Sequence, residues 1–409
     1  MAPDSLISVE KALERIRAVI RPMPSETINI AQAAGRVLAK EYRARVTQPR
    51  RNVSAMDGYA CRTEDIARTP VKLDVVGSAP AGHPFRGSIG SREAVRIFTG
   101  GQVPSGADTI VVQENTESHG NSVVIRKSAA TGRHIRLAGL DFVEGANGTV
   151  VGRRLAPRDI ALAAAMNVPW LSVRQPPKVG IISMGDELVQ PGEPLGSNNI
   201  VSSNALGLAA LISDRGGQPI DLGIAHDNQA AIHEMAKKAR NADLLVTIGG
   251  ASVGEFDLVR PALEDLGLRI DFWRIAMRPG KPLMFGQLGN LPVLGLPGNP
   301  VSSLICGLVF VSSAIHALLA RTDHAVETVS AFLGSDLPEN DARQDYLRAS
   351  LHLTENDHLV ATPFATQDSS MLSLLAKADC LVLRPPNAPA AKSGDLSKVI
   401  PLNRTDGAV

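Results

Sequence analysis

The spacing of apolar residues divides the chain into stretches of different character. Residues 5–20 carry apolar side chains three or four positions apart, among them Leu13 and Ile16, which predicts an amphipathic helix. Residues 49–138 contain short runs rich in Val and Ile that alternate with Gly, Pro and Ser. This second pattern predicts a small inserted β-rich domain. Helical spacing returns in residues 139–175, which we group with residues 1–48 as an N-terminal α/β linker domain. Packing of the starting helix on the central α/β domain is the alternative.

A βαβα alternation begins after residue 176 and continues to residue 325. Such alternation predicts a central α/β domain with a mostly parallel sheet, and residues 326–409 then read as a C-terminal β domain. We expect helices at about 204–215, 228–240, 257–266 and 299–320. We expect strands at VGIISM, PIDLGIA, LLVTIGG, RIDFWRIA and LPVLGLPG.

The composition argues against several classes of protein. The 409 residues are 44% hydrophobic and 20% charged, with a formal net charge of +1 and 3% aromatic residues. We therefore expect a globular chain with neither nucleic acid nor membrane as a partner. The uncharged segment 301–320 is long enough to span a bilayer, but it follows an LPGNP turn, and we interpret it as a buried core helix.

Cysteine usage and the N-terminus both indicate a reducing compartment. Cys61, Cys306 and Cys380 are far apart and fit neither a zinc spacing nor a disulfide framework. The N-terminal residues lack a secretory pattern. We therefore predict a cytoplasmic protein.

Polar loops follow the predicted strands of the α/β stretch. Ligands of such sheets bind at the carboxyl ends of the strands, so these loops are candidates for one site. Carboxylate oxygens suit Mg²⁺, glycine backbone N–H groups can approach a phosphate, and cationic side chains can hold an anion. The chemistry-bearing residues of these loops are Asp186, Glu187, Asp227, Ser252, Glu255, Asp257, Arg278 and Lys281, together with the GLPGNPVSS turn.

Each loop alone also has an ordinary structural interpretation. The glycine turn after LLVTI could simply reverse the chain, and Asp227 could cap the next helix. In the N-terminal half, the loops with Asp57, Thr99 and Asp141 read, from physics alone, as hairpin turns with local hydrogen bonds. Only the convergence of the α/β loops on one sheet edge favours a site for a phosphorylated ligand with a metal.

The loops taken together resemble a known family. SAMDGYA, TGGQVPSGADTIVVQE, GLDFVEG, GDELVQPGEPLG, GGASVGEFD, RPGKP and LPGNPVSS occur in the order found in molybdopterin molybdenumtransferases, a family related to the gephyrin E domain. The resemblance extends from the first helix to the last strand. It implies an elongated four-part protomer and a homodimer. The implied activity is Mg²⁺-dependent insertion of molybdate into adenylylated molybdopterin, with release of AMP and formation of molybdenum cofactor.

The resemblance also implies roles for individual residues. The positions associated with catalysis are Asp57, Thr99, Asp141 and Glu187. Asp227 and Asp257 are the implied magnesium ligands. The implied substrate and nucleotide positions are Gly249, Gly250, Ser252, Gly254, Pro279, Gly280, Pro297, Gly298 and Asn299. The implied molybdate positions are Arg278, Lys281, Ser302, Arg343 and Ser369. The partner subunit's SAMDGYA and TGG loops are expected to complete the cleft.

This chain departs from the family pattern in places, and two other functions compete. Arg274 and Arg278 replace frequent lysines, which keeps the charge but changes its geometry. Val201 and Ser202 replace a tyrosine and an aspartate of some relatives. A molybdopterin adenylyltransferase would need the α/β domain alone, and a gephyrin-like scaffold could lose the acids that are present here. Molybdopterin adenylyltransferase and molybdoenzyme-maturation proteins are possible partners.

Overall fold

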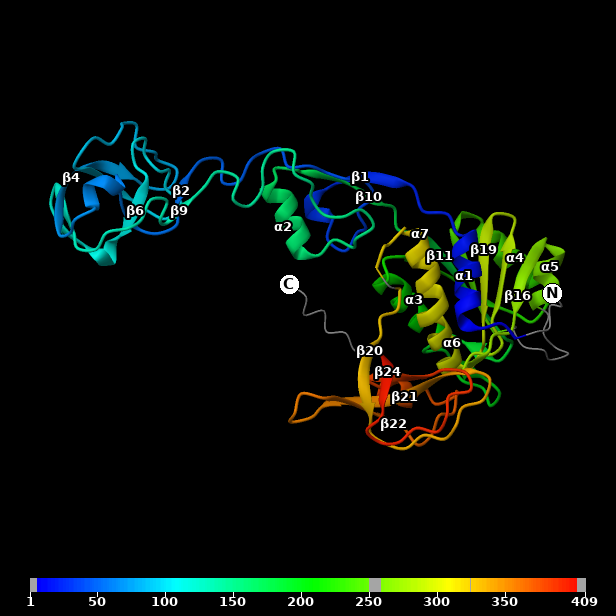
Figure 1. Cartoon of the computed structure of the whole chain (residues 1–409). Coiled ribbons are helices and arrows are strands. Elements are labelled where there is room, and N and C mark those ends of the chain that lie inside the picture. Colours follow the sequence, from blue (N-terminus) through cyan, green and yellow to red (C-terminus); the bar gives the residue numbers. More distant parts are fainter. Residues whose placement is uncertain (1–5, 250–258, 324, 403–409) are drawn as a thin grey trace.

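A computed structural model describes residues 6–249, 259–323 and 325–402 and shows an elongated chain. The β-rich insert lies at one end, the α/β region lies at the other, and the C-terminal β region packs beside the α/β region (Figure 1). The predicted fold class, a central α/β domain with an inserted and a C-terminal β domain in an elongated protomer, is confirmed.

The α/β region is built on one six-stranded sheet. Its strands are, in spatial order, β14 (Gln218–Ala225), β11 (Lys178–Met184), β15 (Leu244–Ile248), β19 (Leu291–Leu296), β18 (Met284–Leu288) and β16 (Leu268–Trp273). The first four strands pair in parallel, whereas β18 is antiparallel to both β19 and β16. The carboxyl end of β16 therefore lies at the same sheet edge as those of the parallel strands.

Strand β18 was not predicted from the sequence. Its first residues, Met284 to Gly286, were interpreted as the end of a loop because they show no polar alternation. All three are buried, and Gly286 lies where a Cβ would meet the Arg269 carbonyl oxygen at 2.6 Å. A strand that is covered on both faces loses the alternating pattern by which sequence reasoning recognises strands.

Helices cover both faces of this sheet (Figure 1). They are α1 (Val9–Val19), α3 (Asn204–Asp214), α4 (Gln229–Lys238), α5 (Val259–Asp265), α6 (Pro300–Cys306) and α7 (Ser312–Leu318). Helix α1 begins after Ser8, whose side chain accepts a hydrogen bond from the Lys11 amide at 3.1 Å. Its buried residue Ile16 belongs to the same hydrophobic core as the sheet.

The apolar segment near residue 300 forms a core helix. Helix α6, a π-helical turn over Gly307–Val311 and α7 are continuous, and they are long and apolar enough to cross a membrane. In the structure, 83% of this segment is buried inside the protein, where it contacts α1 and α3. Its apolar character is thus explained by packing.

The remaining N-terminal elements form two smaller units. One contains the β1 (Ser25–Asn29) and β10 (Trp170–Arg174) pair and α2 (Pro157–Ala165). The insert contains a six-stranded sheet in the order β6 (Thr109–Val112), β3 (Gly58–Cys61), β5 (Glu93–Ile97), β4 (Val71–Ala79), β8 (Ser122–Ile125) and β7 (Thr116–His119). Two-residue strands β2 (Val53–Ser54) and β9 (Ile135–Arg136) pair with each other at the insert. In the α/β region, the short strands β12 (Leu188–Val189) and β13 (Ile200–Val201) pair after β11.

The C-terminal β region closes on itself. Its sheet has the order β17 (Met277–Arg278), β21 (Gln344–Leu353), β22 (Leu359–Pro363), β20 (Val329–Leu333), β24 (Leu396–Pro401) and β23 (Cys380–Arg384). Because β23 also pairs with β21, the last five strands form a ring, and α8 (Leu372–Ala376) lies before β23. Strand β17 comes from the α/β part of the chain and adds to the outside of β21.

Candidate active site

Backbone without side chains lines the carboxyl edge of the central sheet. Gly249 follows β15 with φ +88°, and its amide donates to the Leu296 carbonyl at 3.0 Å. A Cβ on Gly249 would meet the Met184 carbonyl oxygen at 2.8 Å, and one on Gly298 would lie 3.7 Å from the Gly249 Cα. Glycine is therefore required at position 249, where the ends of β11, β15 and β19 meet, and the exposed Gly298 beside it leaves backbone accessible to an anionic ligand.

Acidic residues lie on the next two loops of this edge. Asp186 accepts hydrogen bonds from the His226 ring at 2.9 Å and from the Asp227 amide at 3.2 Å. These two hydrogen bonds hold the pKa of the Asp186 carboxyl below its usual range. Glu187 folds back so that its carboxylate lies over Gly185, where a Cβ would be 2.4 Å from Oε2. The loop after β11 thus holds the loop after β14 and places Asp227 at the site.

Asp227 is suited to hold a cation. Its side chain is exposed, and its carboxylate makes no hydrogen bond or ion pair with any residue of the described ranges. Within those ranges, no group of three His, Cys, Asp or Glu side chains forms a metal cage. Mg²⁺ needs only one or two carboxylates when phosphates and waters complete its shell, so the residues fit a magnesium ion that is bound together with its substrate.

The start of α6 joins the central sheet to the C-terminal ring. Asn204 Nδ2 donates to the Gly298 carbonyl at 2.7 Å, and Asn299 Nδ2 donates to Ser369 Oγ at 3.0 Å. The Val301 amide donates to the Ser369 carbonyl at 3.1 Å. Ser302, in the first turn of α6, is buried beside this contact. The structure therefore brings together Gly298, Asn299, Ser302 and Ser369, all of which were predicted to belong to the site.

A buried arginine supports the loop that carries Ser369. Arg348 is 1% exposed, and its Nη1 donates to the Met371 carbonyl at 3.1 Å. The Arg348 amide also donates to Gln367 Oε1 at 3.0 Å, and Gln367 Nε2 returns a hydrogen bond to the Arg348 carbonyl at 3.0 Å. Burial lowers the pKa of the Arg348 guanidinium. This arginine fixes the loop from beneath without reaching the site itself.

The two arginines predicted to bind molybdate are already paired with acids. Arg278 contacts the buried Asp345, and its Nη1 lies 3.4 Å from Asp341 Oδ2. Arg343 donates to the same Asp341 carboxylate at 2.6 Å, and these contacts lower the Asp341 pKa to about 2. Lys281 is exposed and forms no ion pair within the described ranges. Its ammonium is therefore the most available of the three predicted cations.

The RPGKP turn is tightly packed beneath these cations. Pro279 follows a cis peptide bond, and Gly280 has φ +115°. A Cβ on Gly280 would lie 2.5 Å from the Cys306 sulfur atom. Burial raises the pKa of the Cys306 thiol, and the other two cysteines are also buried and reduced. These thiols belong to the core, not to the site.

The predicted residues of the N-terminal half lie in other parts of the molecule. Asp57 accepts from the Thr99 amide at 2.7 Å and from its hydroxyl at 2.8 Å, so these two residues form one cluster in the insert. Asp141 is exposed beside the two segments that connect to the insert, and its amide donates to the Gln48 carbonyl at 3.0 Å. Figure 1 shows the insert far from the central sheet of the same chain.

Comparison with known proteins decides the family. A curated molybdopterin molybdenumtransferase from Nostoc sp. is 37% identical over 371 residues, which cover 88% of this chain and 85% of the relative.

The chain belongs to the molybdopterin molybdenumtransferase family. A second molybdopterin molybdenumtransferase, from Haemophilus influenzae, is 32% identical over 94% of this chain and 96% of its own length. Residues 7–167 match the MoeA N-terminal region (domain I and II), residues 180–317 match a probable molybdopterin binding domain, and residues 330–402 match the MoeA C-terminal region (domain IV). The resemblance inferred from the sequence is confirmed.

Solved structures support the same assignment to the molybdopterin molybdenumtransferases. A molybdopterin biosynthesis MoeA protein from Pyrococcus horikoshii superimposes with a TM-score of 0.82 at 29% identity and covers 98% of this chain. Another solved structure, of a molybdopterin biosynthesis MoeA protein from Pyrococcus horikoshii OT3, gives a TM-score of 0.84 at 25% identity. The match covers all of both solved chains, so the overall multidomain fold is shared.

Sequence reasoning missed several residues that shape this candidate site. Asn204, His226 and Arg348 act through hydrogen bonds to residues distant in the sequence, and no local pattern marks them. The proximity of His226 to Asp227 was the one available signal. Five candidate residues, Gly250, Ser252, Gly254, Glu255 and Asp257, lie outside the described residues. Pro297 is buried between the end of β19 and Gly298, so it lies at the predicted turn.

Proposed function

We propose that this chain inserts molybdenum into molybdopterin in molybdenum cofactor biosynthesis. The observation that carries the proposal is that Gly249 and Gly298 lie together at the sheet edge where β14 ends before Asp227, while the neighbouring Asn299 is hydrogen-bonded to Ser369. This arrangement combines exposed backbone for phosphates, a carboxylate for a cation, and polar groups from the C-terminal ring. Membership of the molybdopterin molybdenumtransferase family supports the same conclusion.

The proposed substrates are adenylylated molybdopterin and molybdate, and the released nucleotide is AMP. Backbone at Gly298 would hold the phosphates beside the close turn at Gly249, and Lys281, Ser302 and Ser369 would orient molybdate. The charges of Arg278 and Arg343 are offset by Asp341 and Asp345. We therefore assign these arginines to shaping the side of the cleft formed by β17 and the start of β21, not to binding molybdate. Asp227, with Asp257, would hold Mg²⁺. The ion would neutralise negative charge on the phosphates as the adenylyl bond breaks.

The insert of a second subunit would complete the cleft. Asp57 and Thr99 lie at the far end of the elongated chain from Asp227, so they can serve the same reaction only from another copy. A symmetric homodimer supplies such a copy twice, once for each cleft. We place this dimer in the cytoplasm.

The test is a reconstituted reaction. The purified protein is incubated with adenylylated molybdopterin, molybdate and Mg²⁺, and both AMP and active molybdenum cofactor are measured. We expect both products, and both should be lost in Asp227→Asn. If the substrate binds but yields no AMP above a blank, the protein is a scaffold. If the protein makes adenylylated molybdopterin from ATP and molybdopterin, it is an adenylyltransferase.

A further inference from the structure

A second open groove crosses the opposite edge of the central sheet. It has a volume of about 720 Å³ and lies where β15 and β19 begin. Three elements supply its walls: the segment after α1, the end of α4, and the β18–β19 hairpin. Gly249 and Gly298 lie at the other ends of β15 and β19, so a ligand in this groove leaves the candidate active site free.

The charged residues that line the groove are mainly cationic. Arg21, Lys237 and Arg240 face one acid, Asp243. Asp243 accepts from the Lys178 amide at 2.7 Å, which engages its carboxylate with the start of β11. Lys237 pairs with Glu234 at 2.6 Å. Arg21 and Arg240 are exposed and make no hydrogen bond or ion pair with any residue that the structure describes.

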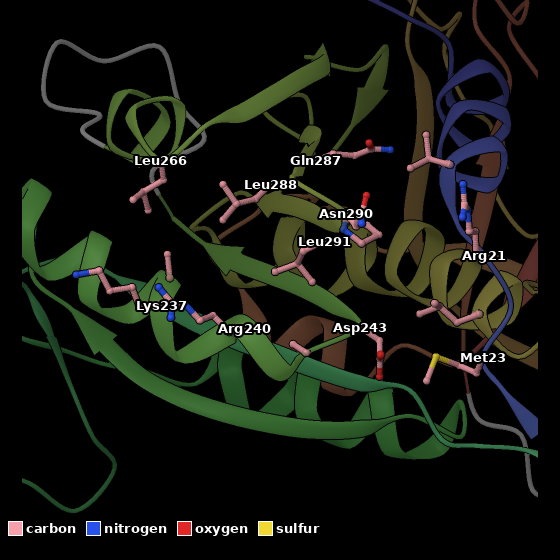
Figure 2. Close-up of a pocket in the computed structure, with 15 residues that line it drawn as sticks. Arg21, Met23, Lys237, Arg240, Asp243, Leu266, Gln287, Leu288, Asn290 and Leu291 are labelled. Carbon is pink, nitrogen blue, oxygen red and sulfur yellow. The ribbon is translucent and has the colours of Figure 1, made fainter. Parts of the chain in front are cut away.

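Leucine side chains separate these cations. Figure 2 shows Lys237 and Arg240 along one side, Arg21 at the far end, and Leu288 and Leu291 between them. Lys237 lies in α4, Arg240 in the turn that follows α4, and Arg21 in the segment after α1. The three cationic groups do not converge on one point. The tight Gly289–Asn290 turn, with φ +62° at the glycine, joins the two paired leucines and keeps that wall in place.

We propose that this groove docks an acidic peptide segment of a partner protein. Separated cations with leucines between them match an extended segment in which acidic residues alternate with pairs of apolar residues. A compact anion would use only one end of the groove. Electrostatic attraction to Arg21 and Arg240 brings the segment in, and contact with the leucines holds it.

The test uses a fluorescein-labelled peptide of repeating Glu-Glu-Leu-Leu units, whose binding to the full chain is followed by fluorescence anisotropy. We expect the double variant Arg21→Glu with Arg240→Glu to bind at least about tenfold more weakly. The matched control is Lys377→Glu with Lys398→Glu. Both lysines are exposed in the C-terminal region and do not line the groove, and replacing them changes the net charge by the same amount. The control should bind within about twofold of the unchanged protein.

Several results would overturn the proposal. These are no binding of the peptide by the unchanged protein, equal weakening in both double variants, or equal binding of a peptide with Lys in place of Glu. Both double variants should keep the melting temperature and the AMP release of the unchanged protein. The proposal therefore stands or fails separately from the proposed function, because peptide binding and AMP release are measured independently.

Discussion

Asp57 accepts two hydrogen bonds from one residue, Thr99, through both its amide and its hydroxyl. Both hydrogen bonds hold the pKa of the Asp57 carboxyl below its usual range, and the bond from the Thr99 amide has the larger effect. The insert therefore presents an ionised carboxylate at every physiological pH. This pairing brings together two predicted residues that are separated by more than forty positions in the chain.

Thr99→Val should raise the pKa of Asp57 toward its usual value, because the hydroxyl donor is lost while the amide donor remains. Carboxyl NMR titration measures this pKa, and Thr99→Ser is the control that keeps the donor. A lowered pKa contributes stability above the unfolded-state value, and this stability is lost as pH falls through the folded value, below about pH 4. An unchanged Asp57 pKa in Thr99→Val would assign the shift to the backbone alone.

Two inactive variants should restore activity when combined. If Asp57 of one subunit serves the cleft of the other, mixed dimers of Asp57→Asn and Asp227→Asn contain one intact cleft. An equal mixture that is allowed to exchange subunits should recover about a quarter of normal AMP release. Each variant alone should be inactive. Failure of recovery, with exchange shown by differently tagged subunits, would place both residues in clefts of a single chain.

Asp186→Asn should weaken magnesium-dependent turnover without removing a proposed metal ligand. The Asp186 carboxylate holds the Asp227 amide and the His226 ring, so its replacement loosens the loop that presents Asp227. Groups that orient a metal ligand are typically worth about ten- to a hundredfold in affinity or activity. The AMP-release rate at increasing Mg²⁺ measures the effect, which excess Mg²⁺ should partly reverse. Glu355→Gln, an exposed change in the C-terminal region, is the control.

Gly280→Ala should destabilise the protein by about 1–3 kcal/mol. An added Cβ would meet the sulfur atom of Cys306 at 2.5 Å, and the residue would have to adopt φ +115°. Gly267→Ala is the matched control, because Gly267 has φ +94° with nothing within 4 Å of an added Cβ. Urea unfolding measures both variants. Equal losses would show that backbone conformation, rather than the contact with Cys306, makes glycine necessary at position 280.

Arg348→Met should release the loop that carries Ser369. The side chain loses its bonds to the Met371 carbonyl and to Gln367, which costs about 1–3 kcal/mol of folding stability. We also expect a higher KM for molybdate with a smaller change in kcat, because the loop orients substrate through Ser369. Arg348→Lys, which keeps the charge but loses the planar fork, should be intermediate. A stability loss without any change in KM would confine Arg348 to a structural role.

The βαβα pattern and the loops after its strands were sufficient to predict the central sheet and the edge that carries the site. Gly249, Asp227 and Gly298 could be placed in this way, because each directly follows a recognisable strand. Strand β18 could not, because burial on both faces removed its alternation. The ion pairs of Arg278 were also beyond reach, since Asp341 and Asp345 lie more than sixty residues away in the chain and meet Arg278 only because β17 pairs with β21.

The short strand β17 has a consequence for how the molecule comes apart. It leaves the α/β region to pair with β21, and Tyr346, Leu381 and Ile400 of the C-terminal ring lie in the core of the central sheet. The two regions therefore share both a strand and an interior. If the chain were cut at residue 325, the C-terminal fragment would lose its pairing with β17, and both fragments would expose the shared interior. Thermal melting should accordingly show one cooperative transition for the C-terminal ring and the central sheet, with no separate early step for either.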